Sequence, residues 1–424
     1  MKAMKEKIGI IGLGYVGLPL AVEFGKFRKV IGFDIDESRV ESLRDGVDHT
    51  NETSEGELKL AVNLEITSDL KKLKSCKIYI ITVPTPIDEN NEPDLKILEA
   101  ASELVGSILK EEDIVIYEST VYPGATEDFC VPILERQSKL KFNKDFFCGY
   151  SPERINPGDK LHRLSNIKKV ISGSNEKTAI KVNNLYKDII DAGTFIAKSI
   201  KVAEAAKVIE NTQRDVNIAL INEFAMIFDK MGIDTQDVLD AASTKWNFIN
   251  FKPGLVGGHC IGIDPYYLAY KSKEIGYCPK MILAGRNINE KMSNFVFQKV
   301  ENLMKNKKIE VEFSKILIFG FTFKENCPDV RNSKVFDLLN HFKRANCEVD
   351  IYDPYANKSD TKKIFGIELH EKPLIGHYDA IIIAVPHDIF RNKKEEYFRS
   401  FGKKNHILFE IKYLLSGTEI DGRL

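Results

Sequence analysis

A glycine-rich turn near the start of the chain restricts its fold more than any other feature. Glycines at positions 12, 14 and 17 stand between an apolar run at residues 7–11 and a helical pattern at residues 18–27. The first glycine permits a tight turn, the second leaves its backbone uncovered, and the third lets helix and strand pack closely. The pattern predicts a strand, a sharp turn and a helix, which together open a parallel α/β sheet.

The same turn predicts a dinucleotide site, because backbone amides at the start of a helix bind a pyrophosphate. These amides belong to Gly12, Gly14, Tyr15, Val16 and Gly17. Asp34 ends the second expected strand, residues 29–33, where an acid accepts hydrogen bonds from a ribose diol and repels a 2′-phosphate. NAD is therefore expected rather than NADP. Arg39 either covers the adenosine half of the cofactor or is a solvated helix residue.

Short β-rich runs alternate with helical segments through the first half of the chain. The runs at 78–83, 114–117 and 169–171 are separated by helical patterns such as 94–109 and 177–188. This alternation predicts a parallel sheet with helices on both faces. An uninterrupted helical pattern then covers 202–231, and a second covers 281–305.

The opening pattern returns after residue 314, which indicates an internal duplication. Residues 315–320 echo 7–12, residues 348–354 echo 30–36, and residues 380–386 echo 79–84. We therefore expect an α/β protein in which two Rossmann-like parallel-sheet domains, 1–200 and 309–424, are joined by a central helical domain with one long helix, 201–308. Residues 321–329 replace the glycine turn in the second copy, so it should bind something other than a dinucleotide.

Composition restricts the partners of the chain. Its 61 basic and 62 acidic residues give a net charge of -1, which favours neither nucleic acid nor a membrane surface. No apolar run approaches the roughly 20 residues that span a bilayer. The seven cysteines form no Cys-x-x-Cys pair, so neither a bound metal nor a disulfide framework is expected. Their number and spacing instead favour a protein of the reducing cytoplasm.

The segment at 257–267 is a candidate catalytic loop. Glycines at 257, 258 and 262 remove side chains around Cys260, which lets a substrate carbon approach the sulfur, and Asp264 is near in sequence. A thiol beside an NAD site indicates an oxidation that passes through a covalent thiohemiacetal and ends as a carboxylate. The other six cysteines are expected to be inert and buried. His259 has either a structural or a catalytic role.

Glu204, Lys207 and Asn211 share one face of the long helical pattern. Spacing alone favours a solvated polar stripe for these three residues.

Segments 12–17, 203–211, 257–260 and 323–324 occur in an order that resembles the UDP-glucose and GDP-mannose dehydrogenase family. Within it, segments 151–160, 252–267 and 323–331 are similar to the UDP-N-acetylhexosamine 6-dehydrogenases of bacterial surface-polysaccharide pathways. The resemblance implies two hydride transfers from sugar C6 to two NAD+, with the aldehyde held on Cys260 as a thiohemiacetal and then as a thioester that water opens. It also implies a homodimer built on the long helix.

The resemblance assigns further roles by position. Lys207 and Asn211 steady the oxyanion, and Asp264 organises the water and the lysine. Glu153 assists thioester hydrolysis as a base, and Thr120 lies near the nicotinamide. The implied substrate-binding residues are Glu153, Arg154, Lys207, Asn211, Lys252, Gly257 and Lys324. Thr85 and Arg331 complete the implied cofactor contacts.

Alternatives remain at this point. Ile263 stands where UDP-glucose members often have lysine, which disfavours UDP-glucose as the substrate. The motifs leave the hexosamine epimer open, UDP-N-acetylmannosamine included. Two other hypotheses remain. One is a dehydrogenase of 3-hydroxy acids, although that class lacks the Cys260 loop and the C-terminal domain. The other is a regulatory protein that binds NAD without catalysing a reaction.

Overall fold

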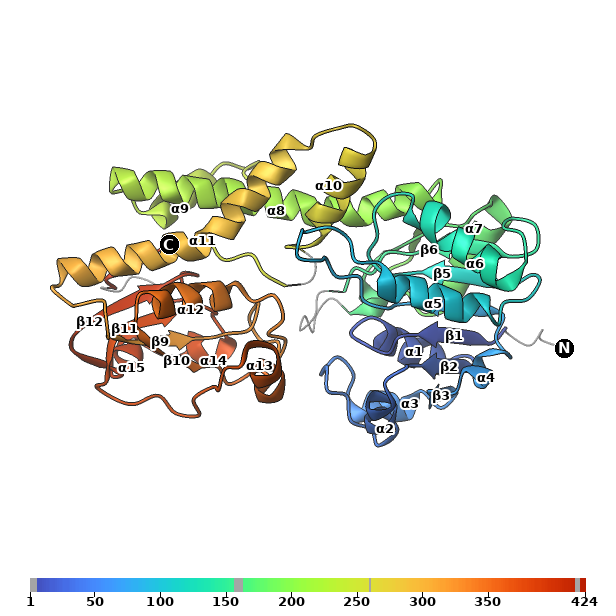
Figure 1. Cartoon of the computed structure of the whole chain (residues 1–424), viewed down its shortest axis with the longest axis horizontal. Coiled ribbons are helices and arrows are strands. Elements are labelled where there is room, and N and C mark those ends of the chain that lie inside the picture. The colour runs from blue at the N-terminus through green and yellow to red at the C-terminus, as the bar shows by residue number, and fades with distance from the viewer. Residues whose placement is uncertain (1–5, 156–162, 259–260, 416–419) are drawn as a thin grey trace. The chain divides into compact units, whose positions relative to one another are not determined.

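The computed structural model describes residues 6–155, 163–258, 261–415 and 420–424 (Figure 1). The chain divides into two compact units. The first contains residues 1–210 and 266–278, and the second contains 211–265 and 279–424. Each unit is built on one main parallel sheet.

The sheet of the first unit has the strand order β3-β2-β1-β4-β5-β6, with every neighbouring pair parallel. This is the strand order of a dinucleotide-binding Rossmann fold. Its strands are β1 (Ile8–Ile11), β2 (Val30–Phe33), β3 (Leu64–Thr67), β4 (Ile78–Ile81), β5 (Ile114–Tyr117) and β6 (Phe147–Tyr150). Strands β1, β2, β4 and β5 are buried at every residue, which explains their continuous apolar sequences.

Helices cover both faces of this sheet, as the alternating pattern predicts. Alternate residues of β1, β4 and β5 pack with α1 and α7 in one apolar cluster. On the opposite face, the Tyr117 hydroxyl hydrogen-bonds Ser102 of α5, at 2.9 Å. The helical segments are α1 (Gly17–Gly25), α2 (Glu37–Arg44), α3 (Glu55–Leu60), α4 (Leu70–Leu73), α5 (Lys96–Gly106), the π-helix Thr126–Cys130, α6 (Val131–Ser138), the 3₁₀ turn Leu164–Asn166 and α7 (Glu176–Tyr186).

The run at 169–171 does form a strand, β7 (Lys169–Ile171), but outside the main sheet. It pairs in parallel with β8 (Thr194–Ile196), which the sequence pattern did not indicate. A short apolar run predicts a strand without identifying its partner, so the expectation of a strand in the main sheet was wrong.

The long helix predicted at 202–231 is α8 (Ile200–Met231), and the helix predicted at 281–305 is α11 (Lys280–Asn306). Residues 200–210 of α8 belong to the first unit and 211–231 to the second. In the sequence, α9 (Thr235–Ser243) and α10 (Asp264–Glu274) come between the two long helices.

The sheet of the second unit has the order β10-β9-β11-β12-β13, again with every neighbouring pair parallel. Its strands are β9 (Lys315–Phe319), β10 (Glu348–Tyr352), β11 (Tyr378–Ile383), β12 (Gly402–Glu410) and β13 (Gly422–Arg423). Its helices are α12 (Lys334–Arg344), α13 (Lys358–Phe365), α14 (Asp388–Arg391) and α15 (Glu395–Arg399). Strands β10, β9 and β11 are arranged like β2, β1 and β4, so the predicted fold class is confirmed, including the second Rossmann-like sheet.

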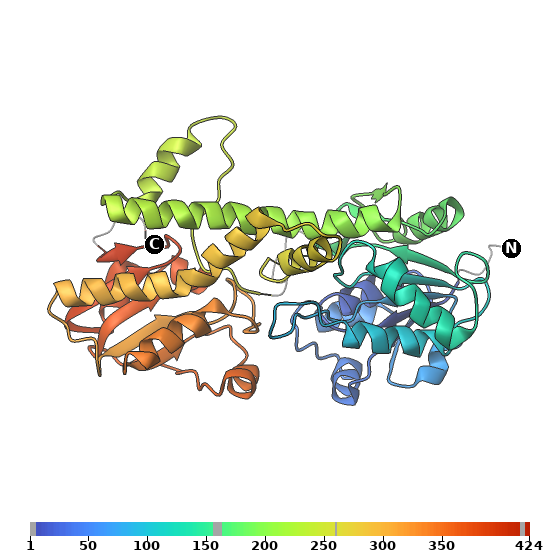
Figure 2. The same cartoon turned by 45° about the horizontal axis from the view of Figure 1, so that its top comes forward.

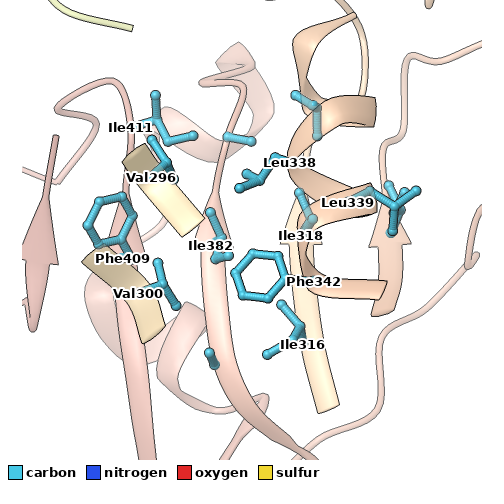
Figure 3. Packing of buried hydrophobic residues seen from close by; sticks show 14 of the residues in the cluster. Val296, Val300, Ile316, Ile318, Leu338, Leu339, Phe342, Ile382, Phe409 and Ile411 are labelled. Carbon is cyan, nitrogen blue, oxygen red and sulfur yellow. The ribbon is translucent and has the colours of Figure 1, made fainter. Parts of the chain in front are cut away.

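Helices α11 and α12 pack on one face of this second sheet. Val296 and Val300 of α11 meet Phe342 of α12 over Ile318 and Ile382 of the strands (Figure 3). Figure 2 shows α11, in yellow-orange, running along the sheet. The opposite face packs against the aromatic residues Phe390, Phe398 and Phe401. Among the helices of the described residues, none combines the length and the apolar character needed to cross a bilayer.

Candidate functional site

The glycine turn between β1 and α1 has the geometry that its sequence predicts. Gly12 has a φ of +92°, which disfavours other residues. A Cβ on Gly17 would lie 1.8 Å from the carbonyl oxygen of Gly12 and 2.4 Å from Thr82 Oγ1, whereas a Cβ on Gly14 would meet no atom within 4 Å. The turn is therefore closed at Gly17 and open at Gly14, which leaves room for a ligand against the backbone.

The start of α1 is suited to a phosphate group. Its N-cap residue is Val16, no side chain caps the helix, and its first turn carries no acidic residue. The first amides of a helix have no partner within the helix and attract anions. The turn and this helix end therefore fit the pyrophosphate of NAD, with Tyr15 and Val16 contributing backbone amides beside the glycines.

Asp34 and Arg39 both bind the glycine turn. Asp34 comes directly after β2 and is half-buried; its Oδ2 accepts a hydrogen bond from the Leu13 amide at 2.7 Å, and its Oδ1 accepts one from the Asp36 amide at 3.0 Å. A carboxylate oxygen accepts two hydrogen bonds, so each still has capacity for a ribose hydroxyl.

The Arg39 guanidinium donates to the Leu13 carbonyl through Nε at 3.0 Å and through Nη2 at 2.8 Å, and Nη2 also donates to Asp48 Oδ1 at 2.7 Å. Burial of Asp48 would raise its pKa, but hydrogen bonds from Thr50 and the charge of Arg39 hold that pKa below its usual value. Arg39 is thus a structural part of the turn rather than a solvated helix residue, because its donors are held by the backbone and by a buried acid.

Thr85 and Thr120 are neighbours after β4 and β5. The Thr85 hydroxyl donates to the Thr120 carbonyl at 2.7 Å, and both residues are half-buried. The loop that follows Thr120 is attached to α8, since the Glu204 carboxylate accepts from the amides of Gly124, at 2.5 Å, and Thr126, at 2.9 Å.

The polar stripe on α8 is buried. Glu204, Lys207 and Asn211 have exposed fractions of 0%, 7% and 1%. The interpretation as a solvated stripe, which spacing alone favoured, was wrong. Helical spacing identifies a shared face but does not reveal what covers it.

Asn211 and Asp264 form a buried pair within the second unit. Asn211 Nδ2 donates to Asp264 Oδ2, and Arg214 donates to Asn211 Oδ1. Asp264 is fully buried and is the first residue of α10. The open loop expected at 257–267 therefore ends at Asp264, because α10 has already begun there. Its first turn contains Pro265, which is compatible with the start of a helix.

Glu153 and Arg154 follow β6 and are both held by protein partners in the first unit. The buried Glu153 accepts from Lys169 Nζ at 3.0 Å through Oε2 and from the Arg154 and Ile155 amides through Oε1. Burial would raise the pKa of Glu153, but the charge of Lys169 and these hydrogen bonds hold it below its ordinary value. The Arg154 guanidinium pairs with Glu210 of α8.

In the second unit, the glycines before Cys260 lie against the loop between β9 and α12. A Cβ on Gly257 would lie 2.5 Å from the Asn332 carbonyl oxygen, and one on Gly258 would lie 2.6 Å from the Phe323 ring. The Gly258 amide donates to the Asn332 carbonyl at 3.2 Å. This contact brings residues 257–258 next to the segment that carries Lys324 and Arg331.

The three predicted basic contacts of the second unit differ in their surroundings. Lys252 is exposed, with Nζ 5.9 Å from the centroid of the Tyr413 ring. Lys324 is half-buried over the ring of its neighbour, at 5.7 Å. Arg331 makes a bidentate pair with Asp329, at 3.0 and 2.8 Å. The structure leaves their ligand roles as predictions.

His259 and Cys260 lie outside the described residues. Of the other cysteines, Cys278 is exposed, so the expectation that all six are buried was wrong at that position, which follows the end of α10. The remaining five are buried thiols: Cys76, Cys130, Cys148, Cys327 and Cys347. Burial raises the pKa of Cys76 and Cys130 to about 12. Such thiols are poor nucleophiles at neutral pH.

The second sheet uses the position equivalent to Asp34 differently. Asp353 follows β10, and the pairing of Ile316 with Val349 matches that of Ile8 with Val30. Asp353 Oδ2 accepts from the Phe321 amide at 2.6 Å and contacts His387 Nε2 at 3.1 Å, and both side chains are fully buried. The Asp353 carboxylate is therefore not accessible to a ribose in the way that the half-buried Asp34 is. The sequence repeat of 30–36 at 348–354 aligns Asp34 with Tyr352, and only the strand register shows that Asp353 is the equivalent residue. Neither Asp353 nor His387 was identified from the sequence.

Comparisons with known proteins agree with this architecture. Sequence models of the UDP-glucose/GDP-mannose dehydrogenase family match the NAD binding domain at residues 6–190, the central domain at 201–291 and the UDP binding domain at 317–417. The predicted NAD cofactor is thereby confirmed, and the turn and Asp34 fit it.

Individual relatives match over nearly the whole chain. UDP-N-acetyl-D-glucosamine 6-dehydrogenases from Salmonella typhi and Pseudomonas aeruginosa are each 56% identical over 99% of this chain, covering 98% and 100% of those proteins. A solved structure of UDP-D-ManNAc dehydrogenase from Pyrococcus horikoshii aligns with a TM-score of 0.89 and 29% identity over 98% of both chains. The chain belongs to the UDP-glucose/GDP-mannose dehydrogenase family and is an NAD-dependent nucleotide-sugar dehydrogenase.

Proposed function

We propose that this enzyme oxidises the C6 hydroxyl of a UDP-N-acetylhexosamine, with UDP-N-acetylglucosamine as the first candidate, to the uronic acid. The observation that carries the proposal is the 56% identity, over 99% of the chain, to relatives named UDP-N-acetyl-D-glucosamine 6-dehydrogenase. The solved UDP-D-ManNAc dehydrogenase has 29% identity, which favours the gluco substrate over the manno epimer. UDP-glucose is the remaining alternative.

The reaction removes four electrons in two steps. The alcohol loses a hydride and a proton to give an aldehyde, the Cys260 thiol adds to its carbonyl carbon, and the thiohemiacetal loses a second hydride and proton to give a thioester. Water then breaks the C–S bond and releases the carboxylate. NAD+, when bound, accepts each hydride, so two NADH form per sugar. Covalent attachment retains the aldehyde while the cofactor is exchanged.

Each of the other proposed catalytic residues has its own role in the reaction at Cys260. Lys207 and Asn211, both buried on α8, donate to the sugar oxygen as negative charge develops there. Asp264 holds the Asn211 amide through their hydrogen bond, which fixes the direction of its donor group. Glu153 accepts the proton of the hydrolytic water, and Thr120 lies beside the nicotinamide.

Ligand-binding roles complete the proposed site. Gly12, Gly14, Tyr15, Val16, Gly17, Asp34, Arg39, Thr85, Thr120 and Arg331 are proposed for NAD. Glu153, Arg154, Lys207, Asn211, Lys252, Gly257 and Lys324 are proposed for the UDP-sugar. Support for a UDP-sugar comes from the match of the UDP binding domain at 317–417.

The same proposal includes three functional domains at 1–200, 201–308 and 309–424, which the family matches at 6–190, 201–291 and 317–417 support. It also includes a homodimer through α8, whose second half exposes apolar side chains, and a cytoplasmic role in supplying a surface-polysaccharide pathway.

A panel of nucleotide sugars tests the substrate. We expect a higher kcat/KM for UDP-N-acetylglucosamine or its galacto epimer than for UDP-N-acetylmannosamine, UDP-glucose or GDP-mannose, with two NADH formed per sugar. A preference for UDP-glucose, or one NADH per sugar, would overturn the proposal.

The covalent step is tested with Cys260→Ser. This variant should bind NAD and UDP-sugar yet lose most turnover, because serine is hardly ionised at neutral pH and an oxygen ester is a poorer acyl donor. Intact-mass spectrometry after one turnover shows whether sugar remains attached as an ester. Normal turnover with two NADH per sugar in Cys260→Ser would remove covalent catalysis.

A further inference from the structure

Four buried polar side chains meet at the carboxyl ends of β5 and β6. Glu118 comes directly after β5, Glu153 lies three residues after β6, Lys169 begins β7 and Tyr186 ends α7. Their exposed fractions are 1%, 7%, 1% and 0%. Ligands of parallel α/β sheets bind at the carboxyl ends of the strands, so this cluster occupies a functional edge of the sheet.

One lysine serves two carboxylates in this cluster. Lys169 Nζ donates to Glu118 Oε2 at 2.7 Å and to Glu153 Oε2 at 3.0 Å. The Tyr186 hydroxyl donates to the other oxygen of Glu118. Glu153 Oε1 already accepts two backbone amides, at 2.6 and 2.5 Å, so its remaining capacity among the described residues is at Oε2.

Stability does not account for this arrangement. Removing a charge from water costs several kcal/mol per ion, roughly, and apolar residues of similar volume often stabilise a fold as well or better. Two acids with one base leave a buried excess of negative charge when all three ionise. Unbalanced ionisable clusters of this kind are typical of functional sites.

We infer that Lys169 and Glu118 are positioning residues for Glu153. Lys169 holds the Glu153 carboxylate ready to accept a proton from the hydrolytic water, and Glu118 limits how completely the lysine neutralises it. The inference rests on the proposed role of Glu153 as the base of thioester hydrolysis.

The proton balance of that step is simple. The water oxygen bonds to the thioester carbon, its proton passes to Glu153 Oε2, and the C–S bond breaks to leave the thiolate. Glu153 then returns the proton to the sulfur, and no electrons are exchanged. Lys169 remains an ammonium group throughout and keeps the carboxylate oriented.

The charges in the cluster support this division of roles. Burial raises the pKa of Glu118 to about 7, with Lys169 opposing the rise and Glu153 adding to it. Burial would also raise the pKa of Glu153, but Lys169 and the two backbone amides hold it below its ordinary value. Burial opposes the charge of Lys169, yet the two acids keep the pKa of the lysine raised.

Two variants should shift the same pH profile in opposite directions. Acyl-enzyme decay is followed by rapid quench and intact-mass spectrometry after mixing enzyme with NAD+ and UDP-N-acetylglucosamine. In Lys169→Met, the acidic limb of the hydrolysis rate should move to higher pH by about one unit or more, because Glu153 loses its cation. In Glu118→Gln, the acidic limb of the hydrolysis rate should move to lower pH, because loss of a neighbouring negative charge lowers the pKa of Glu153. The maximal hydrolysis rate should also fall, because Glu153 becomes a weaker base.

Controls separate this effect from a general loss of structure. Lys77 pairs with the buried Asp113 at 2.8 Å, just before β4 and β5 and thus at the opposite edge of the same sheet. Lys77→Met should lower Tm without moving the pH profile. Lys169→Arg should restore most of the wild-type profile, and if Lys169→Met does not fold, Glu118→Gln still gives the sign of the shift.

Two results are decisive. Shifts in the same direction, or unchanged profiles in folded variants, would overturn the positioning roles. Glu153→Gln distinguishes this outcome from failure of the proposed base. If that variant hydrolyses the acyl-enzyme at the wild-type rate, the role of Glu153 fails and the inference fails with it; if it slows hydrolysis while the other variants change nothing, only the inference fails.

Discussion

Asp34 and Asp353 show how one residue type at equivalent positions has two different uses. Each follows the second strand of its sheet, and each accepts an amide of the turn after the first strand, from Leu13 at 2.7 Å and from Phe321 at 2.6 Å. Asp34 is half-buried, whereas Asp353 is buried against His387. Burial would raise the pKa of Asp353, but the hydrogen bonds from His387 and from the Phe321 and Thr322 amides hold it below its ordinary value. Asp34 is open to a ligand, and Asp353 organises a loop.

Replacement of Asp34 should change cofactor preference. Asp34→Ala should weaken NAD binding about 10- to 100-fold, because hydrogen bonds from the ribose diol to a charged acceptor are lost. It should also reduce discrimination against NADP, since the charge that repels the 2′-phosphate is gone. Dissociation constants for both cofactors, measured by calorimetry, check this expectation.

Two further variants refine the Asp34 test. Asp34→Asn keeps an acceptor for the Leu13 amide and removes only the charge, so it should relax discrimination with a smaller loss of NAD affinity. Glu41→Gln removes an exposed charge from α2 and should leave both constants unchanged. An unaltered NAD to NADP ratio in Asp34→Ala would contradict the assignment.

At the scale of elements, the turn between β1 and α1 separates structural from ligand-binding glycines. A Cβ on Gly17 would overlap the Gly12 carbonyl and Thr82, and a Cβ on Gly14 would meet nothing within 4 Å. Gly17→Ala should therefore lower Tm, with a cost of about 3 kcal/mol or more. Gly14→Ala should keep the wild-type Tm and weaken NAD binding about tenfold or more, because its methyl group occupies the path of the pyrophosphate.

Differential scanning fluorimetry with and without NAD measures both effects on the same samples. Wild-type protein should gain Tm on adding NAD, and Gly14→Ala should gain much less. A normal NAD response in Gly14→Ala would mean that the pyrophosphate does not approach this backbone.

Sequence patterns predicted the elements whose signals are local. Buried strands such as β5 and the long helix α8 follow from apolar runs and uninterrupted helical spacing, and the repeated motifs predicted the second Rossmann-like sheet. Spacing did not reveal that Glu204 of α8 is buried, because its burial depends on contacts with a loop far away in the sequence, at Gly124. The Lys169 cluster was missed for the same reason: its members are far apart in the chain.

For the candidate site, sequence and structure contribute different parts. Motif resemblance selected Lys207, Asn211 and Asp264, and the structure joins Asn211 to Asp264 and buries all three. Their contacts with ligands stay predictions. Networks such as Asp353 with His387 had no local signal, since a partner 34 residues away can only be identified by folding.

At the scale of the whole molecule, the proposed homodimer has a physical basis in the second half of α8. Leu220, Phe224, Ile227 and Met231 have exposed fractions of 45%, 36%, 45% and 62%. Their spacing of four, three and four residues places them on one helix face. Trp246 of the same unit is 91% exposed. A contiguous apolar face of this kind is typical of an association surface.

We therefore expect the wild-type chain to have twice its monomer mass in size-exclusion chromatography with light scattering, and the double variant Leu220→Glu/Ile227→Glu to have the monomer mass. Burying each of these side chains contributes about 1.5–3 kcal/mol, whereas a buried, unpaired glutamate is strongly unfavourable. Lys230→Glu is the matched control, because it changes the net charge by the same amount as the double variant at an exposed position of α8 without replacing an apolar side chain. Circular dichroism should show that the variants keep their helices. A wild-type monomer, or a double variant that keeps the dimer mass, would exclude α8 as the interface, and the exposed apolar face would then require another partner.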